Sequence, residues 1–164
     1  MERDRVDRIM ELWAEREPDL DVSSLEVAGR LLRVAGALER LREATVRRYG
    51  LSPADFDVLA TLRRLADPDG TNPKWLAESA LITTGAMTSR LDRLEAAGHL
   101  RRTPDPHDRR GVLVRITAQG HDLVGAALVA VLDAQSAFLR PLGRRDRPAL
   151  VRGLRALMPA DDGT

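Results

Sequence analysis

Apolar residues recur at helical spacing along the first fifty residues. Residues 1–17 are predicted to form a short helix that Pro18 ends. A second helix is expected to begin at Ser23, because Glu26 stands three positions later as in a capping box, and to end at Gly50. The apolar stripe of this second helix consists of Val27, Leu31, Val34, Leu38 and Leu41.

The next apolar segment begins with the pair Ser52 and Pro53. An N-cap hydroxyl followed by proline at the first helical position predicts a helix that continues to about Leu65. Residues 67–71 combine aspartate, proline and glycine, so they are expected to form a loop.

Two further helices are expected after this loop. The first is short, covers residues 73–80 and is expected to place Trp75 in its core packing. The second covers residues 84–97 and is ended by Gly98.

The pattern then changes to strands. Residues 100–103 and 112–116 read as two strands, and the segment between them is too long for a two-residue hairpin turn, so an extended charged loop is expected. Thr117 is expected to cap a long helix that reaches about Leu142. Asp146 and Pro148 are expected to start a last helix.

This order of elements predicts the fold class. A short helix-turn-helix followed by a β-hairpin is the winged-helix arrangement, so the fold is expected to be mainly α with a small β-hairpin. Three parts follow: N-terminal helices over residues 1–50, a winged helix-turn-helix core over residues 51–117 and C-terminal helices over residues 118–164. More apolar area than one small lobe needs indicates a dimer interface, at Leu123, Leu128, Val131, Leu139, Leu150, Leu154 and Leu157.

Composition narrows the classes of function. Charged residues make up 31% of the 164 residues, yet the net charge is only +1, so nucleic-acid binding has to be argued from where the arginines lie. An aromatic content of 3% disfavours a stacking platform for single-stranded bases. The absence of cysteine excludes disulfides, thiolate metal sites and thiol redox switches. No signal peptide or transmembrane run is visible, so a cytoplasmic location is expected.

One face of the helix at residues 84–97 has the composition of a recognition helix. Met87, Leu91 and Leu94 form a narrow apolar stripe, and the opposite face carries Gly85, Thr88, Ser89, Asp92 and Arg93. Small and hydroxylated residues near the N-terminus let a helix approach base edges and phosphates in the major groove. The alternative is a solvated amphipathic helix, and the preceding short helix and following hairpin favour DNA recognition over it.

The loop between the strands carries a charged tip. Arg109 and Arg110 are suited to the minor groove, where the potential is most negative when the groove is narrow. Asp108 is expected to orient an arginine through a bidentate pair, and Gly111 to relax the turn. The alternative is a solvated charged turn, in which His107 is simply exposed.

Residues 51–120 resemble the DNA-binding core of the MarR family of regulators. The stretches that carry the resemblance are LSPADFDVLATLRR, TTGAMTSRLDRLEAAGHLRR and PDPHDRRGVLVRITAQG. The resemblance implies a homodimer whose terminal helices interlock and whose two lobes straddle a palindromic operator. It also implies that Thr84, Thr88, Ser89 and Arg93 face the major groove, while Arg109 and Arg110 serve the wing.

Within this family the chain looks like the subgroup that responds to urate or aconitate-type acids. That subgroup has an extra N-terminal helix, and its ligand residues would correspond to Trp13, Asp57, Arg90 and Arg102. Arg90 lies about 60° from the buried stripe of its helix, so it points poorly at the groove and needs an internal anion or carboxylate. Asp57 is the expected partner in the free state, which a ligand anion would replace.

The alternative is a structural Arg90–Asp57 ion pair, with Trp13 only anchoring the first helix and Arg102 contacting a phosphate. A winged-helix module for protein contacts, or a regulator without a ligand, is the competing function. An enzyme is disfavoured, because no phosphate loop or nucleophile motif is present and the three histidines are scattered. The expected partners are double-stranded operator DNA, a second copy of the chain and a small anionic ligand, with no membrane, metal or cofactor.

Overall fold

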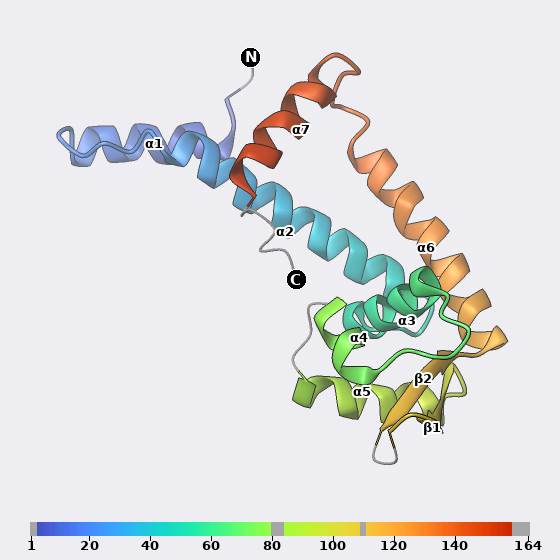
Figure 1. The fold of residues 1–164 in the computed structure, drawn as a ribbon. Helices are drawn as coiled ribbons and strands as arrows, with labels where there is room; N and C mark the ends of the chain where they lie inside the picture. Colours follow the sequence, from blue (N-terminus) through green and yellow to red (C-terminus); the bar gives the residue numbers. More distant parts are fainter. Residues whose placement is uncertain (1–2, 80–83, 109–110, 159–164) are drawn as a thin grey trace.

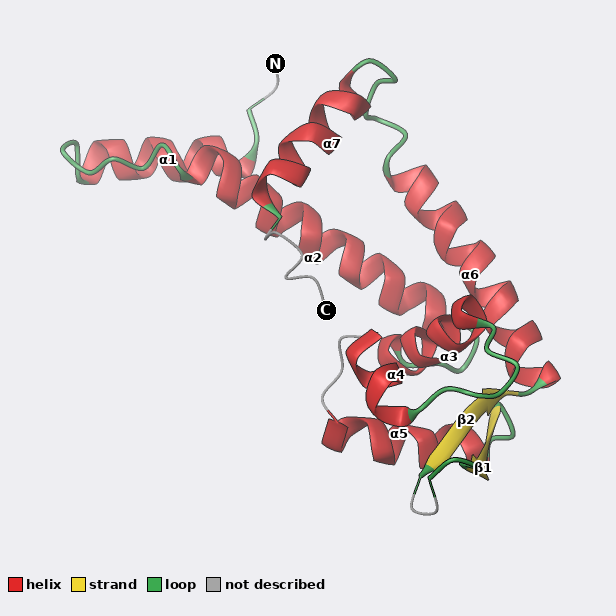
Figure 2. Ribbon diagram, viewed as in Figure 1, coloured by secondary structure: helices red, strands yellow, loops and turns green. Residues whose placement is uncertain are grey.

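The computed structural model describes residues 3–79, 84–108 and 111–158. Figures 1 and 2 show a mainly helical chain with one two-stranded antiparallel sheet. The elements are α1 (Arg5–Arg16), α2 (Leu25–Arg47), α3 (Pro53–Leu65), α4 (Pro73–Ser79), α5 (Thr84–Ala96), β1 (Leu100–Pro104), β2 (Val112–Ile116), α6 (Ala118–Phe138) and α7 (Asp146–Leu157).

Helix α1 is fixed at its first turn. Asp4 caps the helix in a reciprocal capping box with Asp7, and Arg30 of α2 donates to both carboxylates, at 2.9 and 2.6 Å. These contacts hold the pKa of both aspartates below the usual range, chiefly through backbone N–H groups of the box. Val6 is buried beside Gly29, where any Cβ would lie 3.1 Å from a Val6 methyl group. The start of α1 is therefore docked on α2.

The capping box predicted at Ser23 and Glu26 is wrong. Helix α2 begins at Leu25, and its N-cap residue Ser24 makes no side-chain hydrogen bond because it has helical dihedral angles. The N–H of Ser23 is satisfied by the carboxylate of Asp21 at 2.9 Å, within a turn that precedes the helix.

The predicted start of α3 is confirmed. The Ser52 hydroxyl accepts the N–H of Asp55 at 3.1 Å, and Pro53 occupies the first turn. The predicted burial of Trp75 on α4 is wrong, since its exposed fraction is 49%. The seven-residue helix buries Leu76 and Ala77 instead, which leaves the adjacent position outside.

The hairpin has one register throughout. Leu100 pairs with Ile116 and Pro104 with Val112, so β1 is one residue longer than predicted. Thr71, in the loop before α4, forms a bridge with Val114 and extends the sheet by one residue pair.

A tight joint connects α5, the hairpin and α6. Gly98 ends the α5 turn with a φ of 77°, which favours glycine. The Thr117 hydroxyl caps α6 as predicted, accepting the N–H of Gly120 at 3.1 Å and donating to the Gly98 carbonyl at 2.7 Å. A Cβ on Gly120 would lie 2.0 Å from the His99 carbonyl oxygen, so only glycine fits there. Helix α6 ends at Phe138, earlier than the predicted Leu142.

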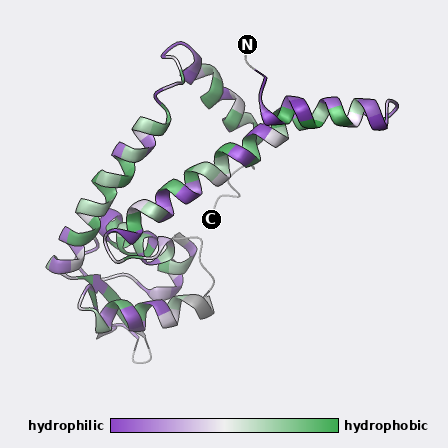
Figure 3. Cartoon of the chain, turned by 180° about the vertical axis from the view of Figure 1, so that it is seen from behind, coloured by the Kyte–Doolittle hydropathy of each residue, from purple (hydrophilic) through white to green (hydrophobic). Residues whose placement is uncertain are grey.

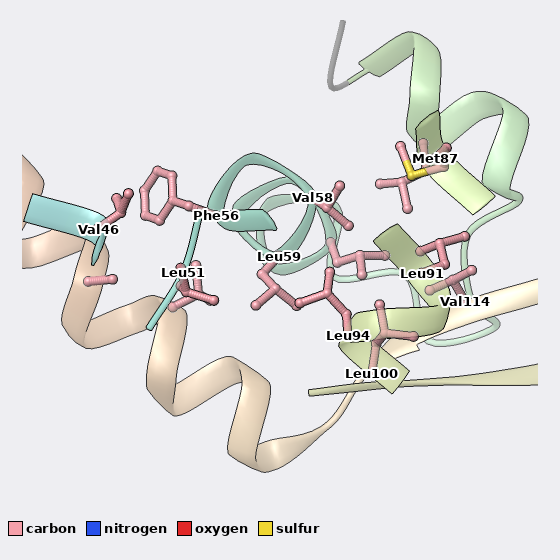
Figure 4. Close-up of a cluster of buried hydrophobic side chains, with 14 of the residues drawn as sticks. Val46, Leu51, Phe56, Val58, Leu59, Met87, Leu91, Leu94, Leu100 and Val114 are labelled. Carbon is pink, nitrogen blue, oxygen red and sulfur yellow. The ribbon is translucent and has the colours of Figure 1, made fainter. Parts of the chain in front are cut away.

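One apolar core holds the lower part of the molecule together. Figure 4 shows side chains from α2, α3, α5, the hairpin and the segment before α3 converging on one cluster. Among the described residues the cluster has sixteen buried members, which include Val58 and Leu59 of α3 and Val124 of α6. We call the part built from α3, α4, α5, β1 and β2 the lobe.

The helices outside the lobe form an open frame. Figure 1 shows α2 and α6 leaving the lobe in different directions and α7 running back toward α2. We call α1, α2, α7 and the C-terminal half of α6 the frame. The residues of the predicted interface stripe fall into two groups: Leu123, Leu128 and Val131 of α6 pack in or against the core, whereas Leu139, Leu150, Leu154 and Leu157 are exposed.

Candidate nucleic-acid interface

Helix α5 has the two faces that the sequence predicts. Met87, Leu91 and Leu94 are buried in the core, whereas Thr88 and Ser89 are exposed. Helix α5 begins at Thr84, the first of the predicted contact residues, whose side chain lies outside the described residues. The lobe therefore presents a hydroxyl-bearing helix face close to its N-terminus.

A buried carboxylate holds the last turn of α5. Asp55 of α3, with a side chain only 8% exposed, accepts a hydrogen bond from Nη2 of Arg93 at 2.5 Å. Its other oxygen accepts from the Ser52 hydroxyl at 2.6 Å. Arg93 itself is 59% exposed, so one nitrogen is bound to the lobe while much of the side chain faces solvent. This pair fixes α5 against α3.

Arg90 lies near the same carboxylate. Its Nε is buried, stands 3.9 Å from Oδ1 of Asp55 and has no hydrogen-bond partner among the described residues. The separation exceeds hydrogen-bonding distance, so the attraction is that of two charges alone. As expected, the guanidinium lies near an internal carboxylate, but that carboxylate is not the one predicted.

The predicted Arg90–Asp57 pair is wrong. Asp57 accepts from Nη1 of Arg42 on α2 at 2.7 Å, and Arg42 also binds Glu39 at 3.0 Å. Hydrogen bonds from the guanidinium of Arg42 to the carboxylates of Glu39 and Asp57 raise the pKa of Arg42. The physical reason is helix geometry: residues two apart on a helix lie on different faces, so Asp55 faces α5 and Asp57 faces α2.

Arg102 is clamped by carboxylates of α5. Its side chain binds Glu95 at 2.8 Å through Nε and Asp92 at 2.5 Å through Nη2, and its N–H donates to Glu95 at 2.7 Å. These bonds lower the pKa of Glu95, mainly through that N–H, and raise the pKa of Arg102. In this structure Arg102 joins α5 to the hairpin.

The base of the wing loop is closed by backbone bonds. Asp105 N–H donates to the Gly111 carbonyl at 3.0 Å, and Gly111 N–H donates to the Asp108 carbonyl at 2.9 Å. The N–H of the exposed His107 donates to the Asp105 carboxylate at 2.8 Å. The predicted contact residues Arg109 and Arg110 lie outside the described residues.

Trp13 is not brought to the other three predicted ligand residues. It lies on α1 with an exposed fraction of 44%, and Figure 1 shows α1 beyond the end of α2 that lies far from the lobe. Within one chain, therefore, Trp13 does not form a wall over Arg90 or Arg102.

Sequence reasoning missed Asp55 and Arg42. A signal for Asp55 was present, since a serine N-cap followed by an acid three residues later is a capping pattern. The role of Arg42 had no local signal, because its contact joins two helices that the core brings together.

Among the described residues, no group of three or more His, Cys, Asp or Glu side chains could hold a metal ion. No helix within the same ranges is long and apolar enough to cross a membrane. A short helix, a second helix with an exposed hydroxyl face and a two-stranded wing define the class as a winged helix-turn-helix protein.

Comparisons with known proteins give the family. The model of the MarR family matches residues 49–111. The HTH-type transcriptional regulator PecS of Dickeya dadantii (strain 3937) is 36% identical over 145 residues, which cover 88% of this chain and 87% of that protein. This chain belongs to the MarR family and is a DNA-binding transcriptional regulator.

Solved structures agree with this assignment. A mutant MarR from E. coli, complexed with operator DNA, has a TM-score of 0.70 and 28% identity, covering 90% of this chain and 99% of that one. The transcriptional repressor CouR, bound to a 23-mer DNA duplex, also has a TM-score of 0.70 and 28% identity, covering 85% and 98%.

Proposed function

We propose that this regulator represses transcription by binding a palindromic operator as a homodimer, and that a small anionic metabolite releases it. The observation that carries the DNA-binding part is the exposed hydroxyl face of α5, fixed from behind by Asp55 and beside the wing by Arg102. A recognition helix held in this way is preorganised, so it loses little conformational entropy when it enters a groove of DNA.

We assign the proposed contact residues to two groups, one for the major groove and one for the minor groove of the DNA. Thr84, Thr88, Ser89 and Arg93 serve the major groove, where Arg93 uses the part of its side chain that Asp55 does not bind. Asp108 orients the wing, and Arg109 and Arg110 enter the minor groove. Replacing Arg109 with glutamine should weaken binding to every duplex and lower the salt dependence by about one phosphate contact.

The proposed homodimer is supported by the apolar surface of the frame. Val27 and Val34 of α2 and Leu150 and Leu154 of α7 are exposed, and they line a cavity of about 470 Å³. Figure 3 shows hydrophobic residues running along α6 and α7. Apolar area of this extent is typical of a surface that another chain covers. A two-fold axis through the frame would place two α5 helices on successive half-sites.

The proposed ligand site centres on Arg90. Its buried Nε lacks a hydrogen-bond partner among the described residues, so an anion that bonded it would remove an existing cost. Urate-like or aconitate-like acids are the proposed class, with Asp57, Arg102 and Trp13 as further candidates. The pairs Asp57–Arg42 and Arg102–Glu95 support the second candidate function, a regulator with no small-molecule ligand, because those side chains already have partners.

One titration separates the two candidates. The wild type and Arg90→Gln are titrated against the DNA upstream of the chain's own gene in a gel-shift assay, with urate, citrate or trans-aconitate added. Release of the wild type by one acid, and resistance of the variant, is the expected result. Tight binding that no acid affects would favour the regulator without a ligand.

A further inference from the structure

Two arginines face each other across the root of the wing. Arg101 of β1 and Arg115 of β2 are directly opposite in the register of the hairpin, so their side chains lie on the same face of the sheet. Directly opposed like charges destabilise a strand pair. Within the described ranges, neither guanidinium forms a salt bridge with a carboxylate.

The Arg115 side chain is held in place. Its Nε and Nη2 donate to the carbonyl oxygen of Asp69, at 3.2 and 2.6 Å. Gly70 packs over its stem, and a Cβ on that glycine would lie 3.1 Å from Cγ of Arg115. The φ of Gly70 is 96°, so the loop shape that carries the Asp69 carbonyl depends on this glycine. The Arg115 guanidinium is thus held by a backbone carbonyl, which fixes its position but does not neutralise its positive charge.

Both arginines line a cavity of about 290 Å³ between the hairpin, the end of α3 and the loop that follows. Ala66, Pro68 and the partly buried Ile116 supply apolar lining, whereas Leu62 and Val114 are almost fully buried. Asp67 also lines the cavity, and its carboxylate accepts the N–H of Asp69 at 2.9 Å. The lining residues therefore carry two positive charges and one negative charge, so the site has a net positive charge. A volume of this order suits a small ligand with an apolar body and one charged group.

We propose that this cavity binds a small organic carboxylate, whose carboxylate lies between Arg101 and Arg115 and whose apolar body rests on Ala66 and Pro68. We call it the wing-root site. It shares no residue with the proposed Arg90 site and does not depend on it. An anion between the two guanidinium groups would offset their mutual repulsion and accept a charge-assisted hydrogen bond from each of them. The apolar lining favours a carboxylate with a hydrocarbon body over a fully hydrated inorganic anion.

The test uses the full-length, DNA-free protein labelled with ¹⁵N and titrated with benzoate at constant ionic strength. Benzoate should shift the amides of Thr71, Arg101 and Arg115, whereas neutral benzamide and inorganic phosphate should move them much less. Arg101→Gln should weaken benzoate binding about tenfold or more, since one charge-assisted contact is lost. The exposed Arg64 of α3 does not line the cavity, so Arg64→Gln is the matched control and should bind normally.

A charge reversal separates the site from a general loss of folding. Arg101→Glu places opposite charges across the strands, so the melting temperature of the free protein should rise by about 1–3 °C while benzoate binding disappears. Benzoate binding that persists in this variant would overturn the proposal, as would equal shifts with benzamide or with phosphate. Benzoate shifts that Arg90→Gln abolishes, with the wing-root amides unmoved, would also overturn it while supporting the Arg90 site.

Discussion

The lobe and the frame differ in how much of their apolar surface is buried within one chain. The lobe buries most of its large apolar side chains within one chain, with Leu59 and Leu76 fully inaccessible, although Trp75 is exposed. The frame leaves Leu150, Leu154 and Leu157 of α7 exposed, and none of the described α7 residues is buried. The contrast teaches that the lobe is stabilised within one chain, whereas the frame has a surface suited to a second chain.

The largest effect on stability is expected when a core side chain of the lobe is truncated. Leu59→Ala should lower the free energy of unfolding by about 2–5 kcal/mol, because a fully buried leucine leaves a cavity. Leu157→Ala, at an exposed position of α7, should change the unfolding of the lobe little and instead make the association of chains weaker. Urea unfolding at several protein concentrations measures both, and equal losses in the two variants would contradict the division.

The next largest effect is expected at Gly120 of α6, where this helix packs closely on the segment before the hairpin. Gly120→Ala places a Cβ about 2.0 Å from the His99 carbonyl oxygen, so a backbone shift is unavoidable. A cost of about 1–3 kcal/mol is expected from such overpacking. Gly153→Ala on α7 is the control, because no atom of the described residues lies within 4 Å of its Cβ and alanine favours the helix. A Gly120→Ala variant as stable as the wild type would show that the close approach is absent.

Asp55 and Asp57 form a matched pair two residues apart on α3. Asp55→Asn removes the charge that holds Arg93, so affinity for operator DNA should fall about tenfold, equivalent to about 1.4 kcal/mol. Asp57→Asn loosens only the bond to Arg42 and should change DNA affinity less. Fluorescence anisotropy with a labelled duplex measures both, and a larger effect from Asp57→Asn would contradict the role given to Asp55.

The smallest effect concerns pH. The pKa of Glu95 is lowered from its ordinary 4.5, so its ionisation stabilises the fold above that value, and this stabilisation is lost as the pH falls through the folded-state pKa. The wild type should therefore melt slightly higher than Glu95→Gln at neutral pH, and the difference should shrink below about pH 4.5. A difference that grows on acidification would contradict the contribution of the Arg102 clamp.

Local patterns predicted most of the lobe. The N-cap at Ser52, the stop at Gly98 and the cap at Thr117 depend on neighbouring residues alone, so the sequence located α3, the end of α5 and the start of α6. The exposed face of α5 followed from helical periodicity in the same way. These features are local, and tertiary packing did not change them.

Apart from the capping box predicted at Ser23 and Glu26, the main errors concern contacts between segments that are distant in the sequence. Asp57 and Arg90 are plausible partners by charge, but which of two aspartates on α3 faces α5 depends on how that helix is rotated in the core. Trp75 was assigned to the core by residue type, whereas the orientation of a seven-residue helix decided its exposure. Side-chain partners across elements need the packed structure.

The most direct test of the account is the stoichiometry and specificity of DNA binding. Light scattering after size exclusion, with DNA from upstream of the chain's own gene, should give two chains per operator duplex, at an affinity well above that for a scrambled duplex. The double variant Leu150→Asp and Leu154→Asp should fold its lobe but lose this complex, since charges replace exposed apolar contacts of the frame. A single chain bound per operator, or equal affinity for the scrambled duplex, would contradict a dimeric operator-specific regulator.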